Sequence, residues 1–146
     1  MRQAIEEFLQ CRSLAIVGAS RSGRKFGNAA LTELAKRGYR VVPIHPSATD
    51  ISGVPCYPSL ASARGIVDGV IVSVHPQDSL RVLREAAAIG LKKIWLQQGA
   101  ESLEVMTLAK SLGLDPVTNR CILMYAVPVG GFHAWHRGLF RLLGKL

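Results

Sequence analysis

The sequence is short of several residue types, and each shortage excludes a class of protein. Its 146 residues include only three cysteines, and no two of them have the CxxC spacing of a metal or redox site. Three such cysteines are typical of reduced thiols in a cytoplasm. No uncharged apolar run approaches the roughly 20 residues of a membrane span. Glu6 and Glu7 stand where a signal peptide would be apolar. We therefore expect a cytoplasmic protein with no membrane segment and no export.

Aromatic residues are also scarce, at 6%, and acidic residues are outnumbered. The 18 Lys and Arg against 10 Asp and Glu give a net charge of +8, which attracts polyanions such as nucleic acid, a membrane surface or a phosphorylated small molecule. No block of five basic residues occurs. No aromatic residue is interleaved with the cluster of Arg21, Arg24 and Lys25, as a base-stacking surface requires. The pattern disfavours nucleic acid as the partner.

What the sequence does have is the composition of a packed domain, with 49% apolar residues, 14 Gly and 7 Pro. Apolar periodicity predicts helices over 1–10, 28–37, 80–89, 102–112 and 132–143, with Ser102 as an N-cap and Gly38 just beyond a helix end. Continuous apolar runs predict buried strands over 13–17, 39–44, 67–74 and 93–96, with short candidates at 114–117 and 121–125.

This alternation predicts a Rossmann-like α/β fold. We expect a doubly wound, mostly parallel sheet with helices on both faces, in one domain spanning residues 1–146. Pro43 lacks the N–H that a central strand needs, so its strand must bulge or lie at an edge.

Ligands of such sheets bind beyond the carboxyl ends of the strands, which selects the loops 18–28, 45–47 and 75–77. In the first loop, Gly18 allows a tight turn, and the loop amides and the helix start near Asn28 supply N–H donors for a diphosphate. The dinucleotide pattern GxGxxG is not met, because Ser20 replaces its second glycine. The alternative is a tight connection with solvated basic residues.

The end of the second predicted strand, 39–44, lacks the acidic residue of NAD-binding domains. NAD-binding domains place Asp or Glu there to hold a ribose hydroxyl, and here no acidic residue occurs before Asp50. This disfavours ordinary NAD binding and favours an adenosine that bears an extra phosphate.

Eight segments match a known family in collinear order from residue 13 to 125. They are 18–20 (GAS), 25–28 (KFGN), 38–46 (GYRVVPIHP), 53, 56–60 (CYPSL), 67–68 (VD), 95–99 (WLQQG) and 119–121 (NRC). In these segments the sequence resembles the stand-alone bacterial CoA-binding proteins, which are small relatives of the CoA-binding domain of the succinyl-CoA synthetase α subunit. One departure is Tyr125, where many members have an acidic residue.

The resemblance implies that the chain holds coenzyme A. It implies a diphosphate site in the first loop, made by Gly18, Ala19, Ser20, Arg21, Arg24, Lys25 and Asn28. It also implies an adenosine side lined by His45, Pro46, Val74, His75 and Pro76. The synthetases need a further domain for catalysis, so we expect a non-catalytic module that binds CoA or acyl-CoA, as a homodimer or with an unknown protein partner.

Three rival interpretations remain open. Cys121 is either a buried structural cysteine or a reactive thiol. His133 and His136, with Cys121, have half of a zinc signature, against a plain polar helix face. The chain itself is alternatively an enzyme or sensor using NAD(P) or another adenine nucleotide, or a basic nucleic-acid-binding protein.

Overall fold

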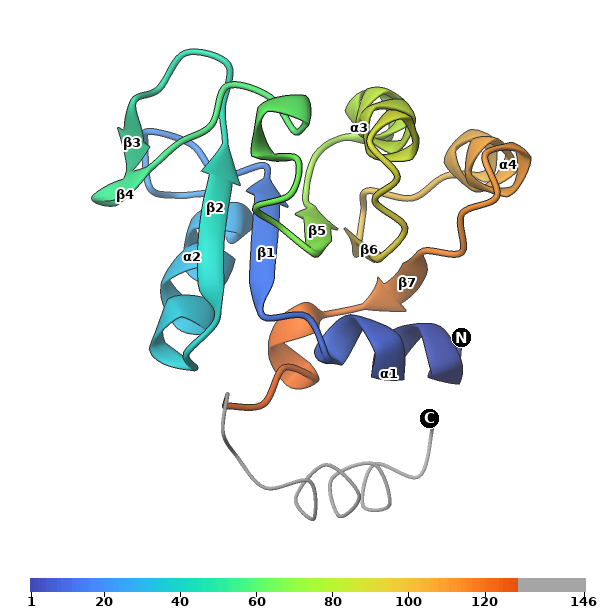
Figure 1. Cartoon of the computed structure of the whole chain (residues 1–146), viewed down its shortest axis with the longest axis horizontal. Helices are drawn as coiled ribbons and strands as arrows, with labels where there is room; N and C mark the ends of the chain where they lie inside the picture. Colours follow the sequence, from blue (N-terminus) through green and yellow to red (C-terminus); the bar gives the residue numbers. More distant parts are fainter. Residues whose placement is uncertain (129–146) are drawn as a thin grey trace.

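Five strands form a central sheet in the computed structural model, which describes residues 1–128 (Figure 1). The five strands of this sheet are β1 (Ser13–Val17), β2 (Arg40–Ile44), β5 (Gly69–Val72), β6 (Ile94–Gln97) and β7 (Val117–Arg120). The short strands β3 (Asp50–Ile51) and β4 (Val54–Pro55) form a separate two-stranded sheet. The helices are α1 (Arg2–Leu9), α2 (Phe26–Lys36), α3 (Pro76–Ala88) and α4 (Leu103–Ser111), with 3-10 turns η1 (Ala61–Ala63) and η2 (Ile122–Met124).

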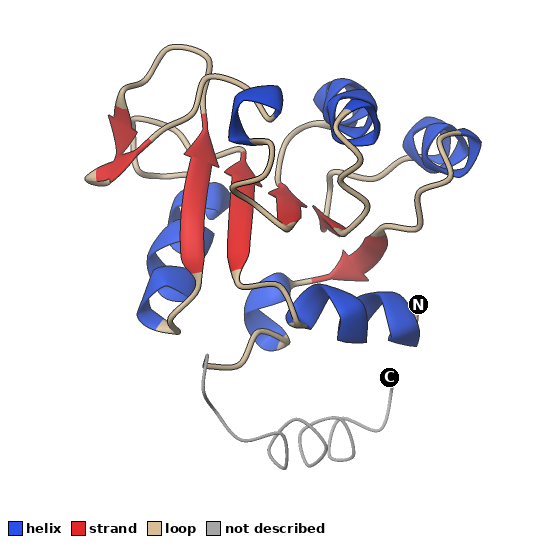
Figure 2. Cartoon of the chain, in the orientation of Figure 1, coloured by secondary structure: helices blue, strands red, loops and turns tan. Residues whose placement is uncertain are grey.

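The sheet has the order β2-β1-β5-β6-β7, and every neighbouring pair is parallel. Its strands are apolar on both faces because helices cover both sides. From β1, Leu14 and Ile16 point into one apolar cluster, and Ala15 and Val17 point into the other. The first cluster also holds residues of α1 and α2, and the second holds residues of α3 and α4 (Figure 2). The predicted doubly wound, parallel α/β fold is confirmed.

Pro43 lies in β2, which is an edge strand, as its missing N–H predicts. On its inner side it pairs with Ile16 of β1. On its outer side its carbonyl accepts a 3.0 Å hydrogen bond from the Tyr57 N–H, and the Tyr57 carbonyl accepts another from the His45 N–H. The segment around Tyr57 therefore closes the outer edge of β2 just where this strand ends.

The ends of the helices follow local capping chemistry. Ser102 is the N-cap of α4, and its hydroxyl accepts a hydrogen bond from the Val105 N–H at 3.1 Å, a contact that stabilises by about 1 kcal/mol. Gly38 has φ +92 just after α2, where a left-handed residue ends a helix. Helix α3 begins at Pro76 and not at residue 80, because proline suits the first turn, whose N–H groups have no intrahelical partner.

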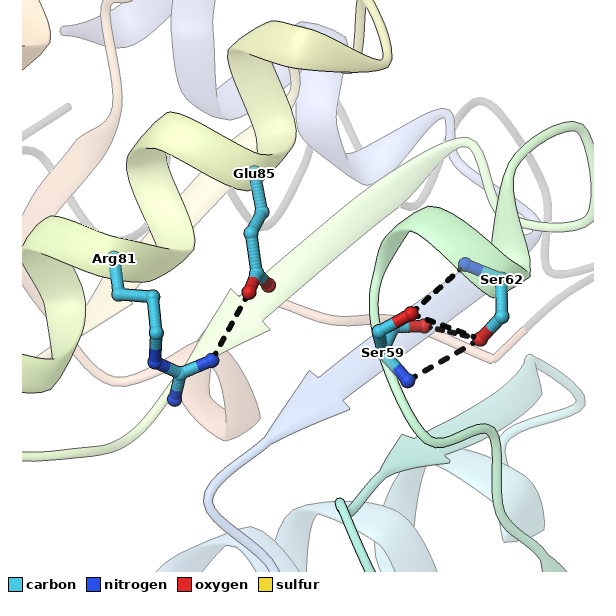
Figure 3. A network of polar contacts seen from close by, with 4 residues as sticks. All are labelled: Ser59, Ser62, Arg81 and Glu85. Carbon is cyan, nitrogen blue, oxygen red and sulfur yellow. Dashed lines mark hydrogen bonds and ion pairs between the residues drawn. The ribbon is translucent and has the colours of Figure 1, made fainter.

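The connection into β5 is held by two serines (Figure 3). The Ser62 N–H donates to Ser59 Oγ at 3.1 Å, and the Ser59 N–H donates to Ser62 Oγ at 3.2 Å, so each residue caps the other at the start of η1. On α3, Arg81 and Glu85 form an exposed ion pair at 3.1 Å, of the i,i+4 kind that supports a helix weakly. The two serine bonds fix the turn at the start of η1, on the way from β4 to β5.

Two segments differ from the prediction. Residues 50–55, which lie outside every predicted strand, form the β3–β4 hairpin, whose turn residues Ser52 and Gly53 have φ of 52 and 78. This is the geometry of a two-residue hairpin turn, and the Ser-Gly pair between Ile51 and Val54 was its signal.

The last strand begins at Val117, later than the predicted 114–117. Where a strand was predicted over 121–125, the chain forms the 3-10 turn η2. Asn119 adopts φ 56, which breaks the extended backbone, and the Ile122 N–H donates to the side chain of Gln97 at 3.2 Å and not to a neighbouring strand. The side chain of Gln97 thus accepts the Ile122 N–H, which would have bonded to a neighbouring strand had 121–125 formed a strand.

The predicted helix over 132–143 lies outside the described residues. Within residues 1–128, none of the helices combines the length and the apolar content of a membrane span.

Candidate functional site

A crevice opens where the strand order reverses. The chain passes from β1 to β2 on one side and returns to β5 on the other, so the loops after β1 and β5 separate at this point. A cavity of about 340 Å³ lies there. Its lining comes from the loops after three strands, with Gly18, Lys25 and Phe26 after β1, Ser73, Val74, His75 and Asp78 after β5, and Gln98, Gly99 and Ala100 after β6.

Gly18 is required by the close approach of two strand ends. It has φ +122, and a Cβ at this position would stand 2.0 Å from the carbonyl oxygen of Ser73. The Ser73 N–H in turn donates to the Val17 carbonyl at 2.8 Å. Any side chain at residue 18 would push the loops after β1 and β5 apart, so this glycine sets the width of the crevice floor.

Gly27 brings the start of α2 against the loop. A Cβ there would lie 2.5 Å from the backbone N of Ala19 and 2.6 Å from the carbonyl carbon of Gly18. Phe26 and Gly27 are the first two residues of α2, whose N–H groups have no intrahelical acceptor and carry the positive end of the helix dipole. Gly27 lies within the predicted loop 18–28 but was not among the predicted site residues.

Asn28 shapes the loop from within. Its side chain is 3% exposed, its Oδ1 accepts from the N–H of Ser20 at 3.0 Å and of Lys25 at 3.3 Å, and its Nδ2 donates to the Ser20 carbonyl at 2.8 Å. The carboxamide thus holds both ends of the loop 20–25. Ala19 is buried beneath it, and Ser20 Oγ bonds to Ser22 Oγ at 2.7 Å.

The basic side chains of this loop are exposed. Arg24 and Lys25 lie toward solvent, and Lys25 also lines the cavity as the N-cap residue of α2. Arg21 reaches the loop after β2, where its guanidinium Nη2 donates to Ser47 Oγ. All three cations thus come from the loop that leads into α2, and Lys25 stands at the start of this helix.

The loop after β2 is ordered by His45. Its Nδ1 accepts hydrogen bonds from the N–H of Ser47 at 3.2 Å and of Ala48 at 3.0 Å. Pro46 is exposed. Neither His45 nor Pro46 lines the cavity; they stand beside it, at the edge of the sheet.

The loop after β5 carries the remaining predicted residues. Val74 is half-buried and packs against the core, while His75 is the exposed N-cap residue of α3, which starts at Pro76. Asp78, which was not among the predicted site residues, joins Val74 and His75 in the cavity lining. Its position three residues after His75, in the first turn of a helix, was the available signal.

The two neighbouring glutamines have different roles. Gln97 is 5% exposed, and its side-chain oxygen accepts the Ile122 N–H, so it anchors η2. Gln98 is exposed and lines the cavity. Only the second is available to a ligand.

The cysteines lie elsewhere. Cys11 is fully buried, and this burial, reinforced by the nearby Asp68 charge, raises the pKa of its thiol to about 12. Burial also raises the pKa of Cys56. Cys121 is half-buried beside η2. His133 and His136 lie outside the described residues, and within residues 1–128 no three potential metal ligands gather.

Known proteins with similar sequences supply an independent comparison. The family described as CoA binding domain matches residues 12–126. The chain is 30% identical over 115 residues to an ADP-forming acetate–CoA ligase II of Archaeoglobus fulgidus, a match covering 70% of this chain and 17% of the ligase. It is 26% identical over 119 residues to an uncharacterized protein of Bacillus subtilis, covering 81% and 88%. The chain spans less than a third of the acetate–CoA ligases it matches.

Solved structures share the fold. A conserved hypothetical protein from Pyrococcus furiosus superposes with a TM-score of 0.73 at 38% identity, covering 77% of this chain and 97% of that protein. The dinucleotide-forming acetyl-coenzyme A synthetase 1 of Ca. Korarchaeum cryptofilum superposes with a TM-score of 0.67 at 29% identity, covering 77% of this chain and 27% of the synthetase.

Proposed function

The chain belongs to the CoA binding domain family, and from this premise we propose that it binds coenzyme A or an acyl-CoA in the crevice beyond β1, β5 and β6. The observation that carries the proposal is the glycine cradle at the start of α2. Gly18 and Gly27 bring the helix start, a loop and a second strand end so close that no Cβ fits between them. Lys25 and Phe26 line the cavity, and Phe26 and Gly27 are the first two residues of α2.

This donor set fits a diphosphate. Helix-start N–H groups bind phosphate oxygens with the dipole favouring the anion, and exposed cations add formal charge. Arg21, Arg24 and Lys25 supply three positive charges around this helix start. Asn28 acts by holding the loop in shape, since its own polar atoms already bond to Ser20 and Lys25.

The adenosine and the pantetheine arm of CoA would contact different loops of the crevice. The adenosine would lie along the loops after β2 and β5, near His45, Pro46, Val74, His75 and Pro76. The uncharged pantetheine arm would run over the loop after β6, where Gln98 offers an amide and Ala100 an apolar contact. Within residues 1–128 no nucleophile is hydrogen-bonded to a histidine base, and we propose a binding module without catalysis of its own.

Calorimetric titration with CoA, acetyl-CoA, NAD, NADP and ADP tests this proposal, after any co-purified ligand has been removed and identified by mass spectrometry. We expect binding of CoA and acetyl-CoA, and weaker binding of NAD and ADP. If NAD or ADP bound as tightly as CoA, the pantetheine arm would contribute nothing and the proposal would be wrong.

Two matched lysine variants locate the site. Lys25→Ala removes a charge at the start of α2, whereas Lys36→Ala removes one from the last turn of the same helix. Both side chains are exposed, so neither change should lower the urea midpoint. We expect Lys25→Ala to weaken CoA binding by roughly three- to tenfold, on the scale of a charge-assisted contact, and Lys36→Ala to leave it unchanged.

A further inference from the structure

Basic residues gather at the amino-terminal ends of the strands, at the opposite end of the sheet from the crevice (Figure 1). Arg12 precedes β1, Arg40 opens β2, and Lys92 and Lys93 precede β6. The Arg40 N–H donates to the Arg12 carbonyl at 2.9 Å, so these two residues are direct neighbours. We call these four residues the strand-start face. Its first three members are exposed and Lys93 is half-buried, so this end of the sheet presents positive charge to solvent.

Two buried groups lie close to several of these cations at once. Burial raises the pKa of the Cys11 thiol, and the positive charges of Lys93 and Arg12 oppose the rise. Burial also raises the pKa of Tyr39, and there the charges of Arg12 and Arg37 oppose it. Because such effects fall with distance, the cations before β1, before β6 and after α2 surround one end of the domain.

The cations of the strand-start face are not ion-paired. Within the described residues the ion pairs include no member of this face; they are Arg2–Glu6, Arg37–Glu33 and Arg81–Glu85. Asp68, just before β5, turns its two carboxylate oxygens to the backbone N–H of Arg12 at 3.1 Å and of Ser13 at 3.0 Å. The charged side chains of the face are therefore available to an anionic partner.

The chain leaves the described domain beside this face. Tyr39, the residue before β2, donates from its hydroxyl to the Val127 carbonyl at 2.9 Å. Arg37 donates from its guanidinium to the carbonyls of Leu123 at 2.8 Å and Ala126 at 2.6 Å. These bonds anchor residues 123–127 at the amino-terminal end of β2, so the segment after residue 128 starts next to the strand-start face.

The sequence of that segment, which lies outside the described residues, continues the same charge. No acidic residue follows Asp115. Arg137, Arg141 and Lys145 recur every four residues, a spacing that on the helix predicted over 132–143 corresponds to one side. The other side of that helix would carry apolar residues, namely Phe132, Trp135, Leu139, Leu142 and Leu143. A basic side opposite a side of Trp, Phe and Leu is the pattern of segments that lie in the surface of an anionic membrane.

We propose that the strand-start face and residues 129–146 together form a docking surface for a membrane that contains anionic lipids. The apolar residues of the segment enter the lipid surface, and the cations of the segment and of the face bind the lipid headgroups. The apolar residues favour a membrane over nucleic acid, whose phosphates attract the cations but cannot bury an apolar side. The crevice lies at the other end of the strands and stays open, so this inference does not depend on the proposed function.

Co-sedimentation of the full chain with lipid vesicles tests the inference. We expect binding to vesicles of equal parts phosphatidylcholine and phosphatidylglycerol, and little binding to phosphatidylcholine alone. Binding should fall steeply toward about 1 M salt, where charges are screened over about 3 Å. Each cation near an anionic surface changes the affinity by roughly fivefold, so Arg40→Gln combined with Lys92→Gln should weaken binding by roughly 20-fold.

Two further variants sharpen the test. Arg24→Gln combined with Lys25→Gln removes one arginine and one lysine charge from the loop before α2, at the crevice end, and should keep wild-type vesicle binding. Leu139→Glu places a charge among the apolar residues of the segment. It should abolish vesicle binding and leave the urea midpoint unchanged.

The opposite results would overturn the inference. They are no binding to the anionic vesicles, or equal binding by the wild type and the Arg40→Gln, Lys92→Gln chain. A lower urea midpoint in Leu139→Glu would show that the apolar residues pack against the chain's own domain. Tighter binding to duplex DNA than to the anionic vesicles would assign the face to nucleic acid. Calorimetric titration with CoA measures the proposed function separately.

Discussion

The substitution Gly27→Ala perturbs the proposed site through one methyl group. Gly27 has no positive φ, so alanine is conformationally acceptable there and the effect is purely steric. The added Cβ would stand 2.5 Å from the Ala19 nitrogen, where ordinary contact begins at 3.4 Å. The start of α2 or the loop after β1 must therefore move by roughly 0.9 Å.

This displacement should affect both stability and binding. Overpacking of this kind costs about 1–3 kcal/mol in the free energy of unfolding. It also moves the amides of Phe26 and Gly27 out of the 2.7–3.2 Å range of N–H···O bonds, and the loss of one charge-assisted bond weakens CoA binding by roughly tenfold or more. Urea denaturation and calorimetric titration measure the two effects separately.

Gly90→Ala controls for loss of stability alone. Gly90 has φ +73 with open space around its Cβ position, so alanine there costs about 1–2 kcal/mol in backbone strain without a clash. It follows α3 and precedes β6, so it lies at the amino-terminal ends of the strands, away from the crevice. This variant should unfold more easily and bind CoA as the wild type does. A Gly27→Ala chain that bound CoA with wild-type affinity would show that CoA does not contact the start of α2.

Three further substitutions have expected outcomes. Asn28→Ala should lower the free energy of unfolding by about 2 kcal/mol in urea, because the N–H and carbonyl of Ser20 lose their buried partner; an unchanged midpoint would show that water replaces the amide. Asp78→Asn should strengthen CoA binding by roughly two- to fivefold at low salt and less at high salt, because a carboxylate no longer faces a polyanion in the cavity; equal affinity at both salt concentrations would contradict this. The folded chain holds the Cys11 proton more tightly than the unfolded chain, since the pKa of this thiol is raised to about 12, so stability should fall as pH rises above about 9. In Cys11→Ala this fall should be shallower, and identical pH profiles would exclude Cys11 as a cause.

The sequence predicted the elements whose local signals agree with their packing. The apolar run of β1 stops at Gly18, and the predicted strand matches the observed bounds. The missing N–H of Pro43 correctly indicated an edge strand. In both cases the signal comes from a single residue: Gly18 ends the apolar run, and Pro43 has no N–H to donate. These predictions therefore did not depend on knowing which residues pack together in the fold.

The sequence did not predict the features that depend on contacts between distant parts of the chain. Residues 121–125 have the apolar character of a strand, but the side chain of Gln97, 25 residues away, takes the N–H of Ile122. Gly27 could not be identified as a contact residue, because its neighbours Gly18 and Ala19 approach it only after α2 folds back on the loop. Asp78 lines the cavity because α3 starts at Pro76, four residues earlier than expected, and so places Asp78 in its first turn.

An NMR titration of the 15N-labelled chain with CoA locates the proposed site most directly. We expect amide shifts concentrated in residues 18–28, 45–48, 74–78 and 98–100, at the carboxyl ends of β1, β2, β5 and β6. The amides of Arg40 and Gly90, at the amino-terminal ends of β2 and β6, should move little. Shifts centred on the amino-terminal ends of the strands, or no shifts at saturating CoA, would exclude a CoA site in this crevice.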